Sequence, residues 1–573
     1  VPMGEFFLKI TYMGYAPKFV DSIKLDENRM EYSAGDIPME VSALMSKSVT
    51  VEAIARTIEY QDGKMVVNMN QSLTASGGNA TDALKTVPSV QVDIEGNISM
   101  RGSQNLKILV NNRPSEFLGH DLKQVLESIP AGSIEKIEVI TNPGAKYDAA
   151  GTTGIINIIT KVERQNGFNS IMSLYGNTAD KYNGDITVNY LLNQFNFYGG
   201  YNFYMDNYGQ GDYIMNQETY IFKPMTKFID TTKYLNQTGD YMNQYLYNSG
   251  NIGFDYLIGE KTSLTGSTYF GGGKNKSRSF SENEDYTNYD VTKRLFSKNS
   301  HEDGNSSYFG GGLSFRQEYE SREHELSADI YFSGNNWSED GNSEQIEKNI
   351  GVTSLLQKTT TDNKSNNLNA SVNYTHPLPL GCKVETGFSF NSEHSDDSYL
   401  RSVYNPTGKT WEVDASSTNH FIFDEQITAS YATLSGNISK IHFSAGLRAE
   451  YSHRKGEQKA TDFTLEKDYF YLYPSANLSW SFTDLLQLQL NYSRRVDRPY
   501  KWYLNPRTDY SDSTRVYVGN PNLTPEFANS YEVGLMVNLG FITVTPSIFY
   551  RNEIDVISPI NTYVGTTRYY EFV

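Results

Sequence analysis

The sequence predicts an antiparallel membrane β-barrel that follows a small α/β domain, and three observations lead to this fold class. From about Gly167 onward, apolar and polar residues alternate with period two along strands of about nine to fifteen residues. Tight turns, as at 192–194 and 259–261, alternate with long polar connections near 206–243, 273–305, 335–362, 395–420 and 496–523. Upstream, residues 56–162 combine short helical patterns with strands. A soluble sandwich would show the same alternation, but unequal connections at the two ends are typical of a membrane barrel.

The composition excludes several classes of protein. No apolar run approaches the ~20 residues that a membrane-spanning helix needs, and the mean hydropathy of −0.53 is low for a helical membrane protein. The net charge of −18 argues against nucleic-acid binding. The single cysteine, Cys382, excludes an intrachain disulfide framework and a cysteine metal cluster.

Two segments precede the α/β domain. Residues 1–42 contain short strand patterns at 6–10, 19–25 and 37–41, too few to bury the core of a sandwich, so we expect an N-terminal part to be missing. An irregular β-rich leader is the alternative. Residues 43–55 form a linker with an extended, β-branched run that suits pairing as an added strand on a partner's sheet: Ser48, Val49, Thr50, Val51, Glu52 and Ala53.

The α/β domain, residues 56–162, is predicted from local patterns. Apolar residues recur at helical spacing over 80–87 and 122–129, and a proline ends each pattern. Strands are expected at 90–94, 98–101 and 106–111. The domain ends in the stretch 137–161, where a strand breaks at Asn142-Pro143-Gly144 and a glycine-punctuated loop leads into an apolar run.

Three motifs in this order carry a resemblance to a known family. They are DALKTVPSVQVDIEGNISMRG at 82–102, NLKILVNNRP at 105–114 and IEVITNPGAKYDAAGTTGIINIITK at 137–161. Together they resemble the plug domain of TonB-dependent outer-membrane receptors, especially those of Bacteroidota-type bacteria. The resemblance implies a barrel of the 22-stranded class with the plug inside its lumen. It places the plug motif at Gly102, Asn142, Pro143, Gly151, Gly154 and Asn157.

The resemblance also assigns roles outside the motifs. It implies plug–barrel contacts by plug residues Arg101, Arg113 and Glu138 and by the predicted lumen-facing carboxylates Glu385, Glu450 and Glu532. A solvated arginine in a wet lumen is the alternative for Arg101. Residues 48–53 would be the Ton box, which pairs with periplasmic TonB, and residues 1–42 resemble the end of a carboxypeptidase-regulatory-like β-sandwich.

Residues 163–573 then form the barrel, which we expect to be incomplete. The patterns give about fifteen strands to Tyr550 and a sixteenth from about Asn561, against 22 in the resembled class. The segment 492–535 is similar to a barrel signature that lies well before the C-terminus of these receptors. The sequence therefore predicts that the last C-terminal strands are missing.

The resemblance implies TonB-dependent active import of a scarce nutrient, such as a siderophore, glycan, peptide or vitamin, across the bacterial outer membrane. The alternative is a non-transporting barrel that serves as a scaffold in a secretion, assembly or adhesion complex. The implied partners are TonB with its inner-membrane energising complex, the lipid bilayer, a small ligand and a surface lipoprotein lid, with no nucleic acid.

Catalytic and cofactor chemistry have little support in the sequence. The eight histidines are scattered, and no nucleophile–base pair or metal-ligand spacing stands out, so we expect no enzyme activity and no cofactor. The acidic run 281–285 offers oxygen ligands for Ca²⁺ in an extracellular loop, although a solvated loop is favoured there.

Overall fold

The computed structural model covers the 573-residue chain and divides it into two compact units, 1–56 and 57–573. The described residues are 4–10, 18–25, 35, 37–38, 58–61, 64–69, 79–93, 97–100, 104, 106–114, 122, 126, 129, 131–150, 154–161, 166–178, 180–222, 229–289, 292–321, 323–483, 485–512, 515–539, 542–564 and 567–573. Each unit is treated by itself below.

The first unit contains an antiparallel pair of strands, β1 (Gly4–Ile10) and β2 (Lys18–Leu25). They confirm the strands expected at 6–10 and 19–25. Most of the third expected strand, 37–41, lies outside the described residues. The assignment of this unit to a carboxypeptidase-regulatory-like sandwich stays a prediction.

The α/β domain of the second unit is built on a six-stranded sheet with the order β3-β4-β9-β10-β7-β8. Neighbouring strands are antiparallel except β10 and β7, which run parallel. A separate hairpin, β5-β6, covers the two shorter predicted strands. The bounds are β3 Ile58–Gln61, β4 Lys64–Asn68, β5 Val90–Val92, β6 Ile98–Met100, β7 Leu106–Val110, β8 Arg113–Pro114, β9 Ile134–Ile140 and β10 Gly154–Thr160.

The first predicted helix is confirmed as α1, Ala80–Lys85. It begins with a capping box, in which the Asn79 side chain accepts from the Asp82 backbone and the Asp82 side chain accepts from the Asn79 backbone. Ala80, Ala83 and Leu84 are fully buried against the sheet. Most of the second predicted helix, 122–129, lies outside the described residues, and the 3₁₀ turn η3 (Ala131–Ser133) precedes β9.

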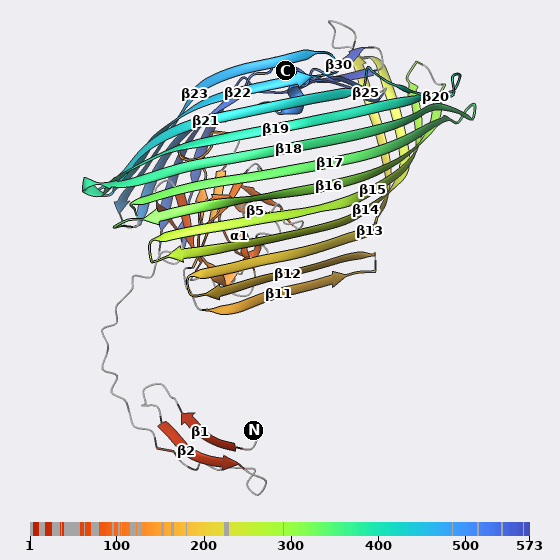
Figure 1. Cartoon of the computed structure of the whole chain (residues 1–573). Helices are drawn as coiled ribbons and strands as arrows, with labels where there is room; N and C mark the ends of the chain where they lie inside the picture. Colours follow the sequence, from red (N-terminus) through yellow and green to blue (C-terminus); the bar gives the residue numbers. More distant parts are fainter. Residues whose placement is uncertain are drawn as a thin grey trace. The chain divides into compact units, whose positions relative to one another are not determined.

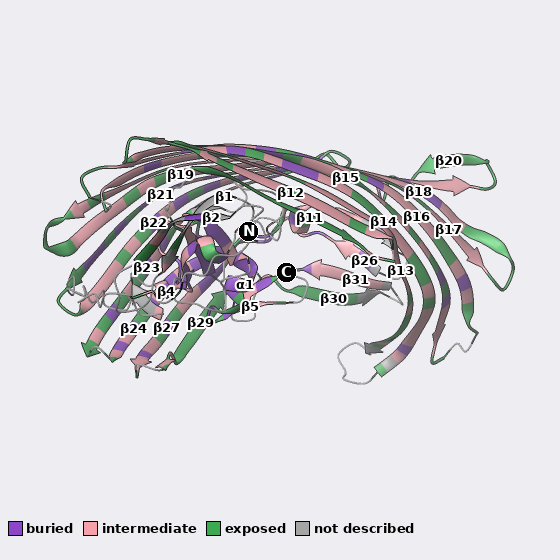
Figure 2. Cartoon of the chain, turned by 90° about the horizontal axis from the view of Figure 1, so that it is seen from below, coloured by how far each residue is buried: buried purple, intermediate pink, exposed green. Residues whose placement is uncertain are grey.

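A long antiparallel sheet, called the wall here, curves around the α/β domain (Figures 1 and 2). Its seventeen strands follow chain order from β11 to β29, and two of them, β20 and β28, are short pieces that pair beside β19 and β27. The bounds are β11 Gly167–Gly176, β12 Lys181–Leu192, β13 Phe195–Phe222, β14 Ile229–Ile258, β15 Thr262–Thr287, β16 Arg294–Glu318, β17 Glu325–Glu347, β18 Val352–Leu378, β19 Cys382–Asn405, β20 Thr410–Val413, β21 Asn419–Ile438, β22 Ile441–Gln458, β23 Phe463–Thr483, β24 Leu486–Asp497, β27 Glu526–Asn538, β28 Thr543–Val544 and β29 Ser547–Ile554.

Four of the five predicted long polar connections are wrong as loops, because most residues of 206–243, 273–305, 335–362 and 395–420 belong to strands. The fifth, 496–523, does connect two wall strands, β24 and β27. Strands β13 and β14 contain 28 and 30 residues and pair almost to their shared tip. About nine to eleven residues suffice to cross a bilayer, so these hairpins extend well beyond a membrane. Outside the bilayer water reaches both faces of a hairpin. Both faces then carry polar residues, so the alternation of apolar and polar residues that identifies a strand in the sequence is lost. Short turns, including the 3₁₀ turn η4 (Pro379–Gly381) before Cys382, join the strands at the other end.

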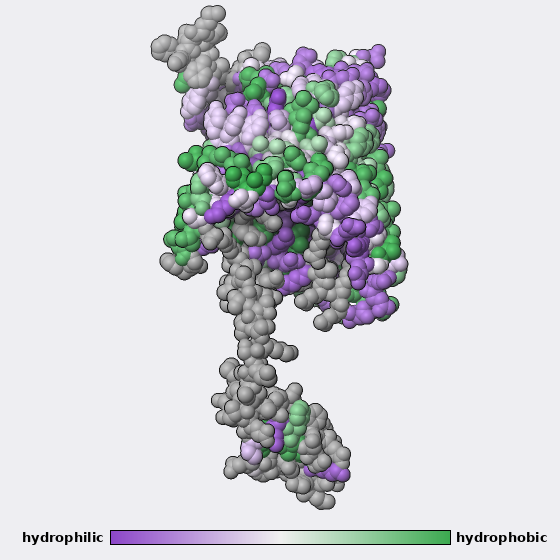
Figure 3. All heavy atoms as spheres, turned by 90° about the vertical axis from the view of Figure 1, so that its left-hand side faces the viewer, coloured by the Kyte–Doolittle hydropathy of each residue, from purple (hydrophilic) through white to green (hydrophobic). Residues whose placement is uncertain are grey.

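The two faces of the wall differ as the period-two pattern predicts. On β22, Leu447 and Tyr451 are each 47% exposed, whereas Arg448 and Glu450 between them are buried. Gln487, Gln489 and Asn491 of β24 are buried on the inner side in the same way. Figure 3, which faces the short-turn end, shows hydrophobic and hydrophilic residues side by side on this face.

Two pieces of chain after β24, on either side of β27 to β29, form a second sheet inside the long-hairpin end, with the order β25-β26-β31-β30 (Figure 2). Its bounds are β25 Thr508–Asp512, β26 Arg515–Val518, β30 Pro559–Val564 and β31 Thr567–Phe572, and a short helix, α3 (Lys501–Leu504), precedes it. The expected sixteenth wall strand from Asn561 is therefore wrong. Apolar residues of α3 and β31 pack against Phe421 and Phe423 of the wall, and this contact holds the second sheet inward.

The edges of the wall are separate in the described part of the chain. There β11 pairs only with β12, and β29 pairs only with β27. The expectation that further C-terminal strands complete the barrel stays a prediction. None of the described helices is long and apolar enough to cross a membrane.

We predict that Gly154→Ala destabilises the α/β domain. A Cβ at Gly154 would lie 1.8 Å from Met100 Cε and 2.8 Å from the Ile140 carbonyl oxygen, and the oxygen belongs to backbone that can move little. Overpacking of this kind costs about 1–3 kcal/mol in the free energy of unfolding. Calorimetry on the purified protein should show the domain's transition at lower temperature. Gly132→Ala is the control, because nothing lies within 4 Å of that Cβ position; an equal shift in both variants would refute the packing argument.

Candidate functional site

Residues 141–150, called the docking segment here, connect β9 toward β10 and lie against the inner face of the wall. Asn142, Pro143, Ala145 and Ala149 are buried there. The segment contacts strands that are far apart in the sequence, from β19 to β27, as the contacts below show. It is where the α/β domain meets the wall.

Glu450 of β22 is the most buried charged group at this junction, at 1% exposure. Its Oε1 accepts from Arg448 Nε at 2.5 Å and from the Ala149 backbone N–H at 3.4 Å. Its Oε2 accepts from Arg498 Nη2 at 2.5 Å. Two guanidinium groups and one amide of the docking segment therefore surround a carboxylate that water does not reach, and charge-assisted hydrogen bonds of this kind are the strong ones.

Glu532 of β27 holds the other end of the docking segment. Its Oε2 accepts from Thr141 Oγ1 at 3.0 Å and from Asn142 Nδ2 at 2.5 Å. Ser493 of β24 donates to Asn142 Oδ1 at 3.3 Å, so both polar atoms of the Asn142 amide are bound to the wall. This accounts for Asn142, one of the predicted plug-motif residues.

Backbone groups join the docking segment to the end of β24. The Val496 N–H donates to the Ala149 carbonyl oxygen at 3.0 Å, and Ala150 and Val496 form a parallel β-bridge. Arg495 Nη2 donates to the Ala150 carbonyl oxygen at 3.4 Å. A small apolar cluster of Ala149, Val496, Tyr473 and Phe527 shields these bonds from water.

The middle of the docking segment approaches the wall closely. Lys146 Nζ lies 3.8 Å from Glu385 Oε1, and both side chains are partly exposed, so this pair is the weaker one. At Gly446 of β22 a Cβ would lie 2.8 Å from Ala145 Cβ, so a glycine there lets the segment lie flat on the strand. Glu385, Glu450 and Glu532, placed by sequence on inner faces, thus each contact the docking segment.

The expected contact of Glu138 with the wall is wrong, because its described partners belong to the α/β domain. Its carboxylate lies 3.3 Å from Lys64 Nζ and 3.0 Å from Lys136 Nζ, and it accepts from Asn157 Nδ2 at 3.1 Å. Burial disfavours the charged carboxylate, but Lys64 and Lys136 outweigh that effect and hold the pKa of Glu138 below its usual range. Asn157, fully buried, also accepts from the Asn112 backbone at 3.0 Å, so this network ties β9 to β10 and β7.

Several predicted residues cannot be placed. Arg101, Gly102 and Gly151 lie outside the described residues, as do the candidate Ton box residues 48–53. Arg113 lies on β8, but its side chain is not among those described. The contacts expected of Arg101 and Arg113 therefore stay predictions.

The acidic run 281–285 lies in β15 and not in a loop. Its carboxylates pair with lysines of neighbouring elements: Glu284 with Lys293 at 2.8 Å, Asp285 with Lys233 at 3.5 Å and Glu282 with Lys348. Over the described ranges, no group of three or more His, Cys, Asp or Glu side chains is placed to hold a metal ion.

Sequence reasoning missed the arginines of the junction. Arg448 shares the inner-face parity of Glu450 two residues on, so the alternation of β22 contained the signal for it. Arg498 lies just after the end of β24, so the alternation of strand residues does not predict which way it faces. Arg495 donates to a backbone carbonyl oxygen. Every residue has such an oxygen, so the sequence of the docking segment does not predict this contact.

Comparison with known proteins identifies both parts of this junction. Residues 62–155 match the family model of the TonB-dependent Receptor Plug Domain, and residues 317–572 match the Outer membrane protein beta-barrel family. Both matches agree with the resemblance seen in the sequence. They do not bear on the Bacteroidota type or on the sandwich proposed for residues 1–42, which stay predictions.

Two solved structures share the fold. "Copper transporter OprC" is 14% identical, with 90% of this chain and 74% of that chain covered and a TM-score of 0.54. The hemophore receptor HasR of Serratia marcescens, a double mutant in complex with its hemophore HasA and heme, is 12% identical, with 90% and 77% covered and a TM-score of 0.52. At these identities the likeness shows the fold alone.

We predict that Glu450→Gln loosens the docking segment. The variant keeps the shape of the side chain but removes the carboxylate that binds both Arg448 and Arg498, and loss of one partner from a buried ion pair costs about 3–5 kcal/mol. Hydrogen–deuterium exchange of a peptide that covers 145–150 should become faster. Glu466→Gln, at an exposed position of β23, is the control. Unchanged exchange in Glu450→Gln would show that the carboxylate does not hold the segment.

Glu138 should make the stability of the α/β domain sensitive to acid. Because its pKa is lower in the folded state, the carboxylate stabilises the fold fully above the unfolded pKa of about 4.3, and this contribution is lost as the pH falls through the lower folded value. We expect Glu138→Gln to lower the domain's melting temperature at neutral pH and to reduce the further loss between about pH 5 and pH 3. Calorimetry of wild type, Glu138→Gln and Glu135→Gln compares the three; a parallel acid response in all would count against the assignment.

Proposed function

Because the chain is a plugged outer-membrane β-barrel of the TonB-dependent receptor family, located in the bacterial outer membrane, we propose that it actively imports a scarce nutrient with energy supplied through TonB. The observation that carries this proposal is the docking of the plug on the wall by a short polar segment. The apolar core of the plug consists of plug residues only, from Met65 to Ile158. The plug can therefore leave the wall without opening its own core.

The junction is suited to reversible release. Apart from one small apolar cluster, the docking segment is held by hydrogen bonds and ion pairs to Glu385, Glu450, Glu532, Ser493 and Arg495. When the segment moves into a wet lumen, water replaces these bonds, and the net cost is about 0.5–1.5 kcal/mol for a neutral hydrogen bond and about 1.5–3 kcal/mol for one to a charged group. Burial of a large apolar interface would hold the plug far more tightly.

The order of strands in the plug gives a path for a pull from the N-terminal side. β3 is the edge strand that a pull would reach first, β4 lies next to it, and β4 pairs with β9. β9 runs directly into the docking segment at Thr141. A force applied by TonB at residues 48–53 would thus reach the docking segment through two strand pairings, without crossing the rest of the sheet.

The proposal covers several classes of nutrient and includes a partner that delivers the nutrient. The two similar structures are named for copper and for a hemophore with heme, so this fold serves cargo of very different chemistry. We include a surface lipoprotein among the partners, in the role of a lid over the long-hairpin end, together with TonB and its inner-membrane energising complex.

Deletion of residues 48–53 tests the proposal. Cells that carry this receptor as their only route for a limiting nutrient are grown on single sources: a ferric siderophore, cobalamin, an oligosaccharide or a peptide. We expect the deletion to abolish growth on the source that the intact receptor supports, with the same amount of receptor in the outer membrane. Val51→Pro, which removes a backbone donor from the added strand, should act like the deletion, and Val51→Ala should not. Growth that survives both changes would favour the scaffold function instead.

A further inference from the structure

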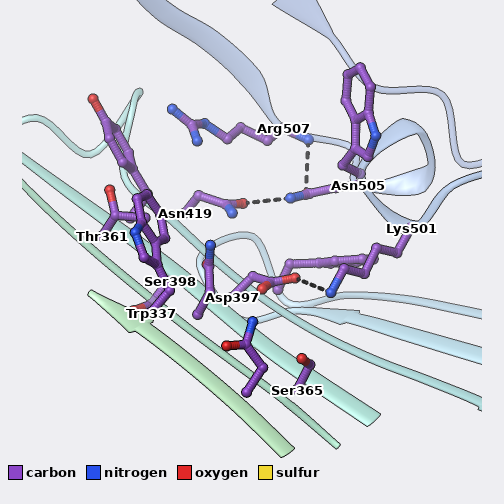
Figure 4. Close-up of a pocket in the computed structure, with 14 residues that line it drawn as sticks. Trp337, Thr361, Ser365, Asp397, Ser398, Asn419, Lys501, Asn505 and Arg507 are labelled. Carbon is purple, nitrogen blue, oxygen red and sulfur yellow. Dashed lines mark hydrogen bonds and ion pairs between the residues drawn. The ribbon is translucent and has the colours of Figure 1, made fainter. Parts of the chain in front are cut away.

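A cavity of about 520 Å³ lies between the inner face of strands β17 to β21 and the segment that carries α3 (Figure 4). Trp337, Thr361, Asp397 and Asn419 reach it from the strands, in the half that belongs to the long hairpins. Lys501, Asn505 and Arg507 reach it from the other side, as Figure 4 shows. The volume is within the range of about 300–1,000 Å³ that small-molecule sites occupy. The docking segment of the plug contributes none of its fourteen lining residues.

Half of the lining residues are uncharged amides or alcohols, among them Asn335, Asn363, Asn419 and Asn505. An amide presents both a donor and an acceptor, and a sugar hydroxyl needs both, so the two groups match in either orientation. Such a lining disfavours heme or another flat apolar ligand, because each buried amide that finds no partner costs free energy.

The charged residues of the lining are engaged with other lining residues. Lys501 Nζ lies 3.2 Å from Asp397 Oδ2, and the Arg507 guanidinium lies over the Tyr399 ring, 4.4 Å from its centroid. One carboxylate and two cations leave the cavity with little net charge. A ferric chelate with several negative charges would find too few cations here to offset the loss of its water.

Aromatic side chains supply the flat surfaces of the cavity. Trp502 is fixed by Tyr503 at 4.2 Å and Tyr517 at 5.1 Å between ring centroids, and it is still 47% exposed. Trp337 reaches the cavity from β17, and Phe421 reaches it from β21. The negative face of an aromatic ring attracts the weakly positive C–H groups on the apolar face of a pyranose ring.

The polar part of the cavity is held in place before any ligand enters. Asn505 Nδ2 donates to Asn419 Oδ1 at 3.1 Å, and Gln458 Nε2 donates to Asn505 Oδ1 at 3.0 Å. Because these amides keep one orientation, a ligand does not have to order them, which favours affinity.

We propose that this cavity binds a short, neutral oligosaccharide, which stacks on Trp337 and Trp502 while its hydroxyl groups bond to the asparagine amides. The inference rests on the proposed function, since it names the class of nutrient that the importer takes.

The test uses the full chain, purified in a detergent without a sugar headgroup, such as lauryldimethylamine oxide. Isothermal titration compares malto-, cello- and xylo-oligosaccharides of three to six units with alanine tripeptide and ferric citrate. We expect at least one oligosaccharide to bind and the Trp337→Ala variant to bind it at least about tenfold more weakly, because one stacking surface is lost. Trp480→Ala is the matched control, since Trp480 is 41% exposed on β23 and lies outside the cavity.

Three outcomes would overturn the inference. They are the absence of binding by every oligosaccharide, binding of the tripeptide or ferric citrate that Trp337→Ala weakens, and oligosaccharide binding that Trp337→Ala leaves unchanged. A Thr361→Ala variant, a small change in the same lining, should weaken oligosaccharide binding with little risk to the fold. None of these measurements involves TonB. If they fail while growth still depends on residues 48–53, the importer function stands and only the ligand class is wrong.

Discussion

The buried carboxylate of Glu450 is the interaction on which the junction between plug and wall depends. Removal of a carboxylate from water costs several kcal/mol, and the cost is offset only when good partners surround it. Here the partners come from three places: Arg448 on the same strand, Arg498 after β24 and the Ala149 amide of the plug. If the docking segment leaves, Glu450 keeps both guanidinium groups and loses one neutral amide. The Glu450 carboxylate therefore keeps its charged partners on the wall, and the plug can leave without unpairing it.

This arrangement also accounts for where the plug is rigid. The Glu138 network fixes β9 to β10 and β7 inside the plug with two lysines and two asparagines. β9 ends directly before the docking segment, so the segment leaves a fixed strand in a defined direction. Thr141 and Asn142 then meet Glu532, and Ala149 and Ala150 meet the end of β24. A strongly held core and a weakly held contact surface thus lie next to each other in the sequence.

Most of the fold follows from local sequence, and the exceptions have physical reasons. Period-two alternation identifies the wall strands and places Glu385, Glu450 and Glu532 on its inner face. It fails in the outer halves of β13 to β18, because both faces are wet there and the apolar pattern ends while the backbone ladder continues. The wall contact that the family resemblance implies for Glu138 is wrong, because a polar residue in a small mixed sheet can be satisfied within that sheet. Residues 501–523 and 559–572 turn inward because Leu504, Leu523 and Phe572 pack against Phe421 and Phe423, and a contact between residues so far apart in the sequence is not predicted by any local pattern.

The junction and the cavity share one short piece of chain. Arg498 binds Glu450, Pro499 accepts from Arg454 of β22 at 2.9 Å, and α3 begins at Lys501, which pairs with Asp397 in the cavity. Lys501, Trp502, Asn505 and Arg507 line the cavity within nine residues of Arg498. A ligand that shifts α3 must therefore move the backbone that carries Arg498, and a change at Arg498 alters the surroundings of Glu450 directly. Since binding free energies are reciprocal, a plug that docks well on Glu450 would in turn favour one position of α3. If the proposed ligand shifts α3, the same segment would carry that shift from the cavity to Arg498 and Glu450.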